Sequence, residues 1–201
     1  DNFGIERLQY TREAYTAGKY AFVSDVARVE ALYQYGGVYM DTDVEVLKSF
    51  NPLLEAQCIL GMEEKEYVAT SFMAFEKGHP LVKEFLNLYE QLSFLDKKGQ
   101  IIAGTNVAKL TKMLKEKGFV QENHYQELEN GIQIYPKEFF SPYDYINCHY
   151  NITENSYCVH YFAVSWMSKK EQVKKEIKKR IVKILGPEKM NEIREKLWKK
   201  N

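Results

Sequence analysis

Apolar side chains recur at three- to four-residue spacing through residues 10–35, which is the period of one face of a helix. The spacing predicts a helix that ends at Gly36 and Gly37, because glycine is frequent just beyond the last turn of a helix. The same period predicts a second helix from Pro80, where proline fits the first turn, and a third from Asn106, which we expect to cap it.

Runs of β-forming residues are interleaved with these helices. They predict buried strands at residues 38–40, 58–62, 70–75, 132–136 and 157–163. Strands that alternate with helices in one chain are typical of α/β domains. We therefore expect an α/β fold with a mixed, mainly parallel sheet flanked by helices.

The composition is compatible with one folded domain and a sizeable core. Of the 201 residues, 45% are hydrophobic and 14% aromatic, and no apolar run approaches the roughly 20 residues that cross a bilayer. The three cysteines are an odd number without C-x-x-C spacing, which argues against a disulfide framework and a zinc site. This usage favours a reducing, cytoplasmic setting.

Charge is distributed unevenly along a chain whose net charge is zero. Residues 169–201 contain 13 basic and 5 acidic residues, so this segment carries +8 and residues 1–168 carry −8. We expect residues 169–201 to form a basic helical extension, divided at Gly186, that either lies on an anionic membrane or packs its apolar stripe on the domain. The acidic body and the lack of a recognition motif argue against nucleic-acid binding.

Asp41 and Asp43 directly follow the strand predicted at residues 38–40. In an extended segment, side chains two positions apart point to the same side, so both carboxylates would meet one ligand. A divalent cation with oxygen ligands, Mg²⁺ or Mn²⁺, is the natural partner of two such groups. The alternative is that both acids only solvate a turn.

Three other carboxylate sites are tested by the same residues. A calcium-binding EF-hand loop that starts at Asp41 fails, because Val46 and Pro52 stand where glycine and glutamate are required. A haloacid-dehalogenase-type phosphatase would use Asp41 as nucleophile, but Glu45 occupies the position of its Thr or Val, and this class stays a rival. A glycosidase needs two carboxylates that flank a sugar, which neighbouring strand positions do not supply by themselves.

A longer pattern surrounds the two aspartates: S-D-x-x-R, a helix, G-G-x-Y and D-x-D. Its members are Ser24, Asp25, Arg28, Gly36, Gly37, Tyr39, Asp41 and Asp43. This pattern resembles the catalytic centre of the DXD-motif sugar transferases of the GT-A fold (glycosyltransferase family 32 type). That group contains bacterial capsular-polysaccharide transferases, yeast mannosyltransferases, α-1,4-galactosyltransferases and the glucosylating domains of large clostridial toxins. The resemblance extends over most of residues 10–168, so we expect a GT-A domain at residues 1–168.

The resemblance implies roles for single residues. Asp43 would coordinate Mn²⁺ or Mg²⁺ directly, while Asp41 would reach the metal shell and the ribose of a nucleotide-sugar. Asp25 and Arg28 would bind the hydroxyls of the donor sugar. As alternatives that need no substrate, these two residues would form an intrahelical ion pair, Ser24 a helix cap, Gly36 and Gly37 a turn, and Tyr39 part of the core.

His160, Ser165 and Trp166 complete the predicted site. The resemblance puts the histidine near the metal and the diphosphate, and all three would close over the donor. The resemblance implies a retaining, metal-dependent transferase that moves a hexose from a UDP- or GDP-sugar to a saccharide or lipid-linked glycan. The implied role is bacterial capsular or surface polysaccharide synthesis at the inner face of the membrane.

Family members begin with a nucleotide-binding strand that this sequence lacks, so we expect that strand upstream. A non-catalytic glycan-binding protein is the second rival.

Overall fold

The computed structural model describes residues 3–64, 66–144, 149–162, 169–186 and 189–190. The chain folds into two compact units. The first contains residues 1–41 and 49–137, and the second contains residues 42–48 and 138–201. The predicted division between residues 168 and 169 stays a prediction.

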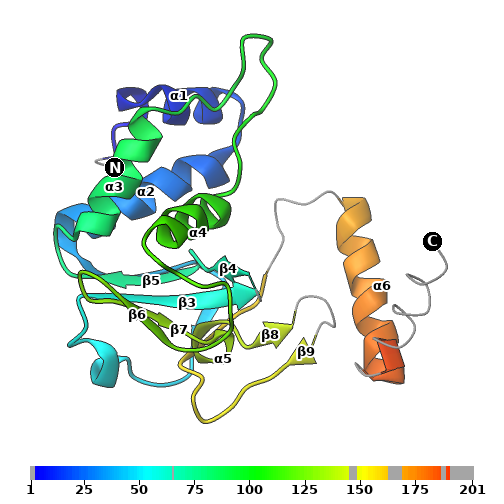
Figure 1. Ribbon diagram of the computed structural model, residues 1–201. Helices are drawn as coiled ribbons and strands as arrows, with labels where there is room; N and C mark the ends of the chain where they lie inside the picture. The colour runs from blue at the N-terminus through cyan, green and yellow to red at the C-terminus, as the bar shows by residue number, and fades with distance from the viewer. Residues whose placement is uncertain (1–2, 65, 145–148, 163–168, 187–188, 191–201) are drawn as a thin grey trace. The chain divides into compact units, whose positions relative to one another are not determined.

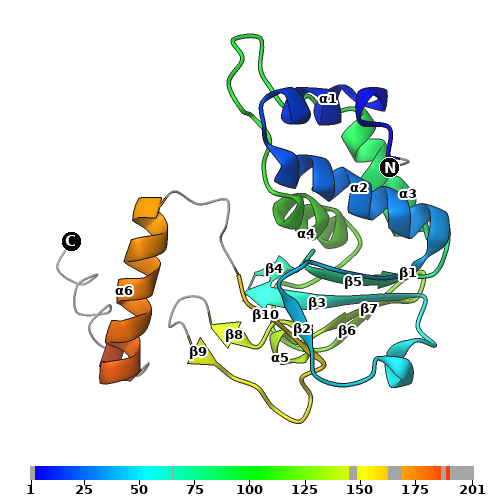
Figure 2. The same ribbon diagram turned by 180° about the vertical axis from the view of Figure 1, so that it is seen from behind.

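The helices of the first unit lie on one face of its sheet (Figures 1 and 2). They are η1 (Ile5–Arg7), α1 (Gln9–Thr16), α2 (Tyr20–Tyr35), α3 (Pro80–Glu90) and α4 (Asn106–Glu116). The 3₁₀ turn η2 (Asn51–Leu53) belongs to the same unit but lies apart from that layer. The single helix expected over residues 10–35 is thus two helices, α1 and α2. Gly18 separates them because its φ of 68° lies in the left-handed region that a helix cannot contain.

A mixed sheet forms the other layer of the first unit. Its strands are β1 (Gly37–Met40), β3 (Cys58–Glu64), β4 (Tyr67–Val68), β5 (Phe72–Phe75), β6 (Gln126–Leu128) and β7 (Ile132–Tyr135). The order is β1-β5-β3-β7-β6, with β4 paired to β3.

The expectation of a mainly parallel sheet is wrong for the described strands. Only β3 and β7 run parallel, and the pairs β1–β5, β3–β5, β3–β4 and β6–β7 are antiparallel. Short connections account for two of these pairs, because β3–β4 and β6–β7 are hairpins, whereas a parallel pair requires a long crossover. The helices expected between strands therefore supply only one parallel pairing.

The core of the first unit lies between its sheet and its helices. Apolar residues of α2, α3 and α4 are buried in one cluster with side chains of β3 and β5; among them are Val26, Val29, Phe85, Leu110 and Met73. Aromatic edges fill the space between the helices, where the rings of Tyr10 and Tyr89 meet at 5.0 Å in a T-shaped arrangement. This packing fixes α2, the helix that carries Asp25 and Arg28.

The second unit is built from short elements. They are β2 (Val44–Val46), α5 (Lys137–Phe140, whose first residue closes the first unit), β8 (Tyr143–Asp144), β9 (His149–Tyr150), β10 (Cys158–His160) and α6 (Lys169–Leu185). β2 pairs antiparallel with β10 (Figure 2), and β8 pairs antiparallel with β9. No described helix is both long enough and apolar enough to cross a membrane.

Candidate active site

Arg28 joins two carboxylates inside the first unit. Its Nη2 lies 3.2 Å from Oδ1 of Asp25, one turn earlier on α2, and its Nη1 lies 2.9 Å from Oδ1 of Asp41, directly after β1. Asp25 and Arg28 are each only 9% exposed. The ion pair expected within α2 is present, and it is part of a larger buried network.

The guanidinium of Arg28 is fixed from several directions. Nη1 also donates to the carbonyl of Thr70 at 2.9 Å, and the guanidinium carbon lies 4.6 Å from the centre of the Tyr39 ring. Tyr39 Oη donates to Oδ1 of Asp41 at 2.7 Å, and burial raises the pKa of this phenol to about 12. Tyr39, which the sequence favoured as a core residue, thus holds Asp41 together with Arg28.

Asn106 contacts the same network from α4. Its Nδ2 donates to Oδ1 of Asp25 at 2.7 Å, across 81 positions of sequence. The expectation that Asn106 caps α4 is wrong, because the capping side chain is Thr105, whose hydroxyl accepts from the backbone N–H of Ala108. Nothing in the sequence pattern linked Asn106 to Asp25.

Burial dominates the electrostatics of Asp25. Loss of water raises the pKa of this carboxyl to about 6, although Arg28, Lys109 and Asn106 each oppose the rise. Burial likewise lowers the pKa of Lys109, whose ammonium lies 5.7 Å from the ring centres of both Tyr10 and Tyr89. Asp25 is therefore a carboxylate held in a dry environment, where a hydrogen bond to a ligand hydroxyl is stronger than in water.

Asp43 and His160 meet inside the second unit. The pairing of β2 with β10 sets His160 opposite Val44, and the backbone N–H of Tyr161 donates to the carbonyl of Asp43 at 3.0 Å. This register brings Nε2 of His160 to 3.3 Å from Oδ1 of Asp43. Sequence analysis predicted both as metal ligands, and they are neighbours although 117 positions separate them.

The segment between the two aspartates is not extended. Thr42 and Asp43 form a turn between β1 and β2. The alternation argument that put both carboxylates on one side of a strand is therefore wrong. Their closeness follows from the chain itself, since two consecutive peptide units span at most about 7 Å.

The remaining predicted residues have local structural explanations or lie outside the description. Ser24 is the fifth residue of α2, so it does not cap that helix. Gly36 ends α2 with a φ of 69°, and a Cβ atom there would lie 2.6 Å from the backbone nitrogen of Lys77. Gly37 has a φ of 95°, and apart from its chain neighbours no atom lies within 4 Å of the place that a Cβ atom would occupy. Ser165 and Trp166 lie outside the described residues.

The residues present fit a divalent cation. Two ligand atoms bound at about 2.1 Å to an octahedral ion are about 3 Å apart, close to the separation of Asp43 Oδ1 from His160 Nε2. Carboxylates suit Mg²⁺ and Mn²⁺, and an added imidazole favours a transition metal.

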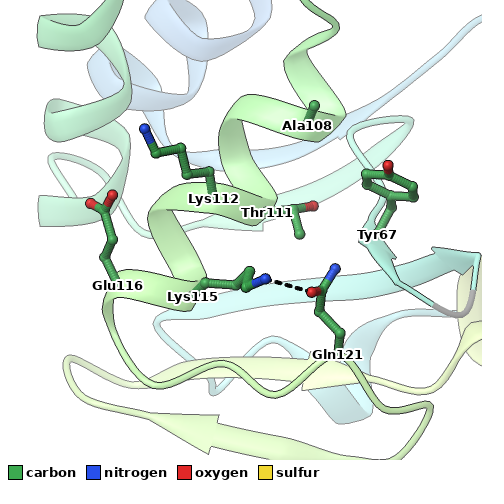
Figure 3. A pocket seen from close by; sticks show the side chains of 7 residues that line it. All are labelled: Tyr67, Ala108, Thr111, Lys112, Lys115, Glu116 and Gln121. Atoms are coloured by element: carbon green, nitrogen blue, oxygen red, sulfur yellow. Dashed lines mark hydrogen bonds between the residues drawn. The ribbon is translucent and has the colours of Figure 1, made fainter.

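A separate groove lies along α4 of the first unit (Figure 3). It has a volume of about 440 Å³. The residues that line it are Tyr67, Ala108, Thr111, Lys112, Lys115, Glu116 and Gln121. Lys115 Nζ donates to Gln121 Oε1 across one end of it at 2.6 Å. It contains none of the predicted site residues, so it does not bear on the assignment of the aspartates.

Comparison with known proteins identifies the segment that carries the aspartates. Residues 5–60 match the family described as glycosyltransferase sugar-binding region containing DXD motif. The matched range includes Asp25, Arg28, Asp41 and Asp43, but not His160. No solved structure shows a significant match to the chain.

Curated relatives point to the same class. Mouse (Mus musculus) lactosylceramide 4-alpha-galactosyltransferase is 30% identical over 125 residues, which are 62% of this chain and 33% of the mouse protein. Inositol phosphoceramide mannosyltransferase 3 of Schizosaccharomyces pombe is 31% identical over 71 residues, 35% of this chain and 20% of that protein. The chain thus spans a third or less of the length of these two relatives. The DXD segment of this chain is thus similar to the sugar-binding region of glycosyltransferases, and these relatives are named as glycosyltransferases.

Proposed function

We propose that the protein is a metal-dependent, retaining glycosyltransferase of the GT-A fold that moves a hexose from a UDP- or GDP-sugar to a saccharide or lipid-linked glycan. The observation that carries this proposal is the buried network of Asp25, Arg28 and Asp41, because all three lie in the segment that matches the sugar-binding region. The mixed α/β architecture is compatible with the GT-A fold.

In the proposed site, Asp43 and His160 would hold Mn²⁺ or Mg²⁺, and the resemblance assigns Asp41 to the shell of the same cation. The contact of Asp43 with His160 supports this assignment. A bound cation neutralises the diphosphate that leaves when the sugar–phosphate bond breaks and a bond to the acceptor oxygen forms. Tyr39 and Arg28 keep the carboxylate of Asp41 oriented, since each contacts its Oδ1.

Asp25 and Asn106 form the sugar end of the proposed site. A dry carboxylate accepts hydrogen bonds from two hydroxyls of a hexose, and its contact with Asn106 and Arg28 fixes its orientation. We assign no catalytic nucleophile. Transferases of this fold that retain the configuration of the sugar have no agreed nucleophile, and these residues do not identify one.

The acceptor is proposed from the relatives. Their names, lactosylceramide 4-alpha-galactosyltransferase and inositol phosphoceramide mannosyltransferase, both contain a ceramide lipid, which supports a lipid-linked acceptor here. A role in bacterial capsule synthesis stays a prediction from the resemblance. A reducing compartment is proposed from Cys58 and Cys158, which are buried free thiols.

Two rivals remain as outcomes of the test. A phosphatase would use Asp41 as nucleophile and would act without Asp25 or Arg28, yet Oδ1 of Asp41 is engaged by Arg28 and Tyr39. A non-catalytic glycan-binding protein would tolerate loss of Asp43. No contact among the described residues favours either over the transferase.

The test is calorimetric titration of UDP- and GDP-sugars into the natural full-length protein with Mn²⁺. We expect one nucleotide class to bind, and we expect binding to disappear with EDTA and in Asp43→Ala. Glu45→Ala is the matched control, since Glu45 is an exposed acid two positions away. If no sugar nucleotide binds, or if Asp43→Ala binds as the parent does, the proposal is wrong.

A further inference from the structure

Helix α6 is strongly basic. Its 17 residues contain eight lysines and arginines and two glutamates, a net charge of +6. At 1.5 Å per residue the helix is about 25 Å long. Such a charge density attracts an anionic surface and repels another copy of the same helix.

The apolar side chains of α6 form one exposed stripe. Val173, Ile177, Ile181, Ile184 and Leu185 fall within about a third of the helix circumference. Their exposed fractions are 58%, 52%, 41%, 82% and 38%. Val182, on a different face, is the one of the helix's large apolar residues that is buried, at 5%.

No described residue of the second unit covers this stripe, because Ile177 and Ile184 are exposed whereas Val182, on another face, is buried. Burying a side chain of this size is worth about 1.5 to 3 kcal/mol, so five of them on one face favour an apolar partner.

We propose that α6 docks on an anionic lipid surface, with its apolar stripe inserted among the acyl chains and its lysines at the headgroups. Both features are required for this partner: the stripe gives an apolar face and the lysines give charge complementarity. A nucleic acid would use the charge alone, and a second α6 would place +6 beside +6. The inference does not rest on the proposed transferase activity.

The test is co-sedimentation of the full chain with vesicles of phosphatidylcholine, alone or with about 30% phosphatidylglycerol. We expect binding to the anionic vesicles, little binding to the neutral ones, and release at high salt, because counterions screen the lysines. Ile177→Gln/Ile184→Gln and Lys174→Glu/Lys183→Glu should each weaken partitioning by about tenfold or more. Glutamine and glutamate preserve helix propensity.

Matched controls change the same residue types elsewhere. Ile101→Gln/Ile102→Gln and Lys97→Glu/Lys98→Glu alter exposed residues of the loop between α3 and α4, and they should bind vesicles as the parent does. Equal binding to both vesicle types, or unchanged binding of the α6 variants, would overturn the proposal. A lower melting temperature of Ile177→Gln/Ile184→Gln would show instead that the stripe packs on the chain. Conversion of a dimer to a monomer by this variant would show that a second copy covers the stripe.

Discussion

At the residue scale, Asp25 combines a high cost of burying its charge with a proposed direct contact to substrate. Its carboxyl is buried among Arg28, Asn106 and Lys109, and the cost of removing its charge from water exceeds what these partners return, since its pKa is raised to about 6. A group that destabilises the fold in this way is expected at a site where function requires it.

Replacing Asp25 with Asn should therefore stabilise the protein at neutral pH. The folded state takes up a proton as the pH falls through about 6, above the pKa of the unfolded chain, so the carboxylate opposes folding above about pH 6 and this opposition fades as the pH falls toward 4. We expect Asp25→Asn to raise the free energy of unfolding by roughly 1 to 3 kcal/mol at pH 7.5 and by less at pH 5.

Thermal unfolding of Asp25→Asn and the parent at both pH values measures this difference. Arg28 keeps its contacts with Asp41 and Thr70 in the variant, so the fold should persist. A variant that is less stable than the parent at pH 7.5 would show that the ion pair with Arg28 outweighs burial. Binding of the sugar nucleotide should be lost in either case.

Tyr39 packs against the core, as the sequence predicted, and it also contacts two residues of the candidate site. Its hydroxyl donates to Asp41 while its ring lies under Arg28. Tyr39→Phe keeps the ring and removes one hydrogen bond to a charged group, so we expect a melting temperature lower by a few degrees and roughly three- to tenfold weaker binding of the metal–nucleotide complex. Scanning and titration calorimetry measure the two quantities. Tyr20→Phe, at a 63% exposed tyrosine, is the control and should bind normally.

At the element scale, the turn from α2 into β1 positions Asp41. Gly36 closes the helix through its N–H to the carbonyl of Leu32 at 2.9 Å, and Gly78 donates to the carbonyl of Tyr33 at 3.0 Å, so the turn packs against the loop before α3. The sequence predicted this turn from its two glycines, and the prediction is confirmed.

Gly36→Ala should destabilise the protein more than Gly37→Ala. Both glycines have positive φ, but only at Gly36 would a Cβ atom meet backbone, 2.6 Å from the nitrogen of Lys77. We expect a loss of roughly 2 to 4 kcal/mol at Gly36 and about 1 to 2 kcal/mol at Gly37. Urea unfolding compares them. Equal losses would mean that backbone strain, rather than the close approach of Lys77, decides the cost.

Local patterns predicted elements better than pairings. Helices α3 and α4 and strands β3, β5 and β7 lie where apolar periodicity and β-forming runs placed them. The direction of strand pairing was wrong because it depends on the connections between strands, which propensity does not encode. β2 was missed as a strand because it lies among the acids after Asp41, and its pairing partner β10 is more than 100 positions away.

At the scale of the whole molecule, the candidate site depends on contacts that sequence spacing does not reveal. Asp41 and Asp43 were found from their motif, whereas the contact of Asn106 with Asp25 spans 81 positions and joins two helices through packing. Sequence spacing likewise does not indicate that residues 42–48 cluster with a segment that begins 90 positions later. Such non-local associations require knowledge of which surfaces pack together.

If the protein binds a metal and a nucleotide in its folded form alone, both ligands should raise the stability of the whole chain. At a ligand concentration 100 times its dissociation constant, binding adds about 2.7 kcal/mol, which corresponds to a rise of roughly 5 to 10 °C in melting temperature for a chain of this size. We expect Mn²⁺ with the preferred sugar nucleotide to produce this rise, and EDTA to reverse it. Asp43→Asn should melt near the parent without ligand yet show no rise, while Glu45→Gln should respond as the parent does. A full rise in Asp43→Asn would mean that the cation is held elsewhere, and the contact of Asp43 with His160 would then be structural.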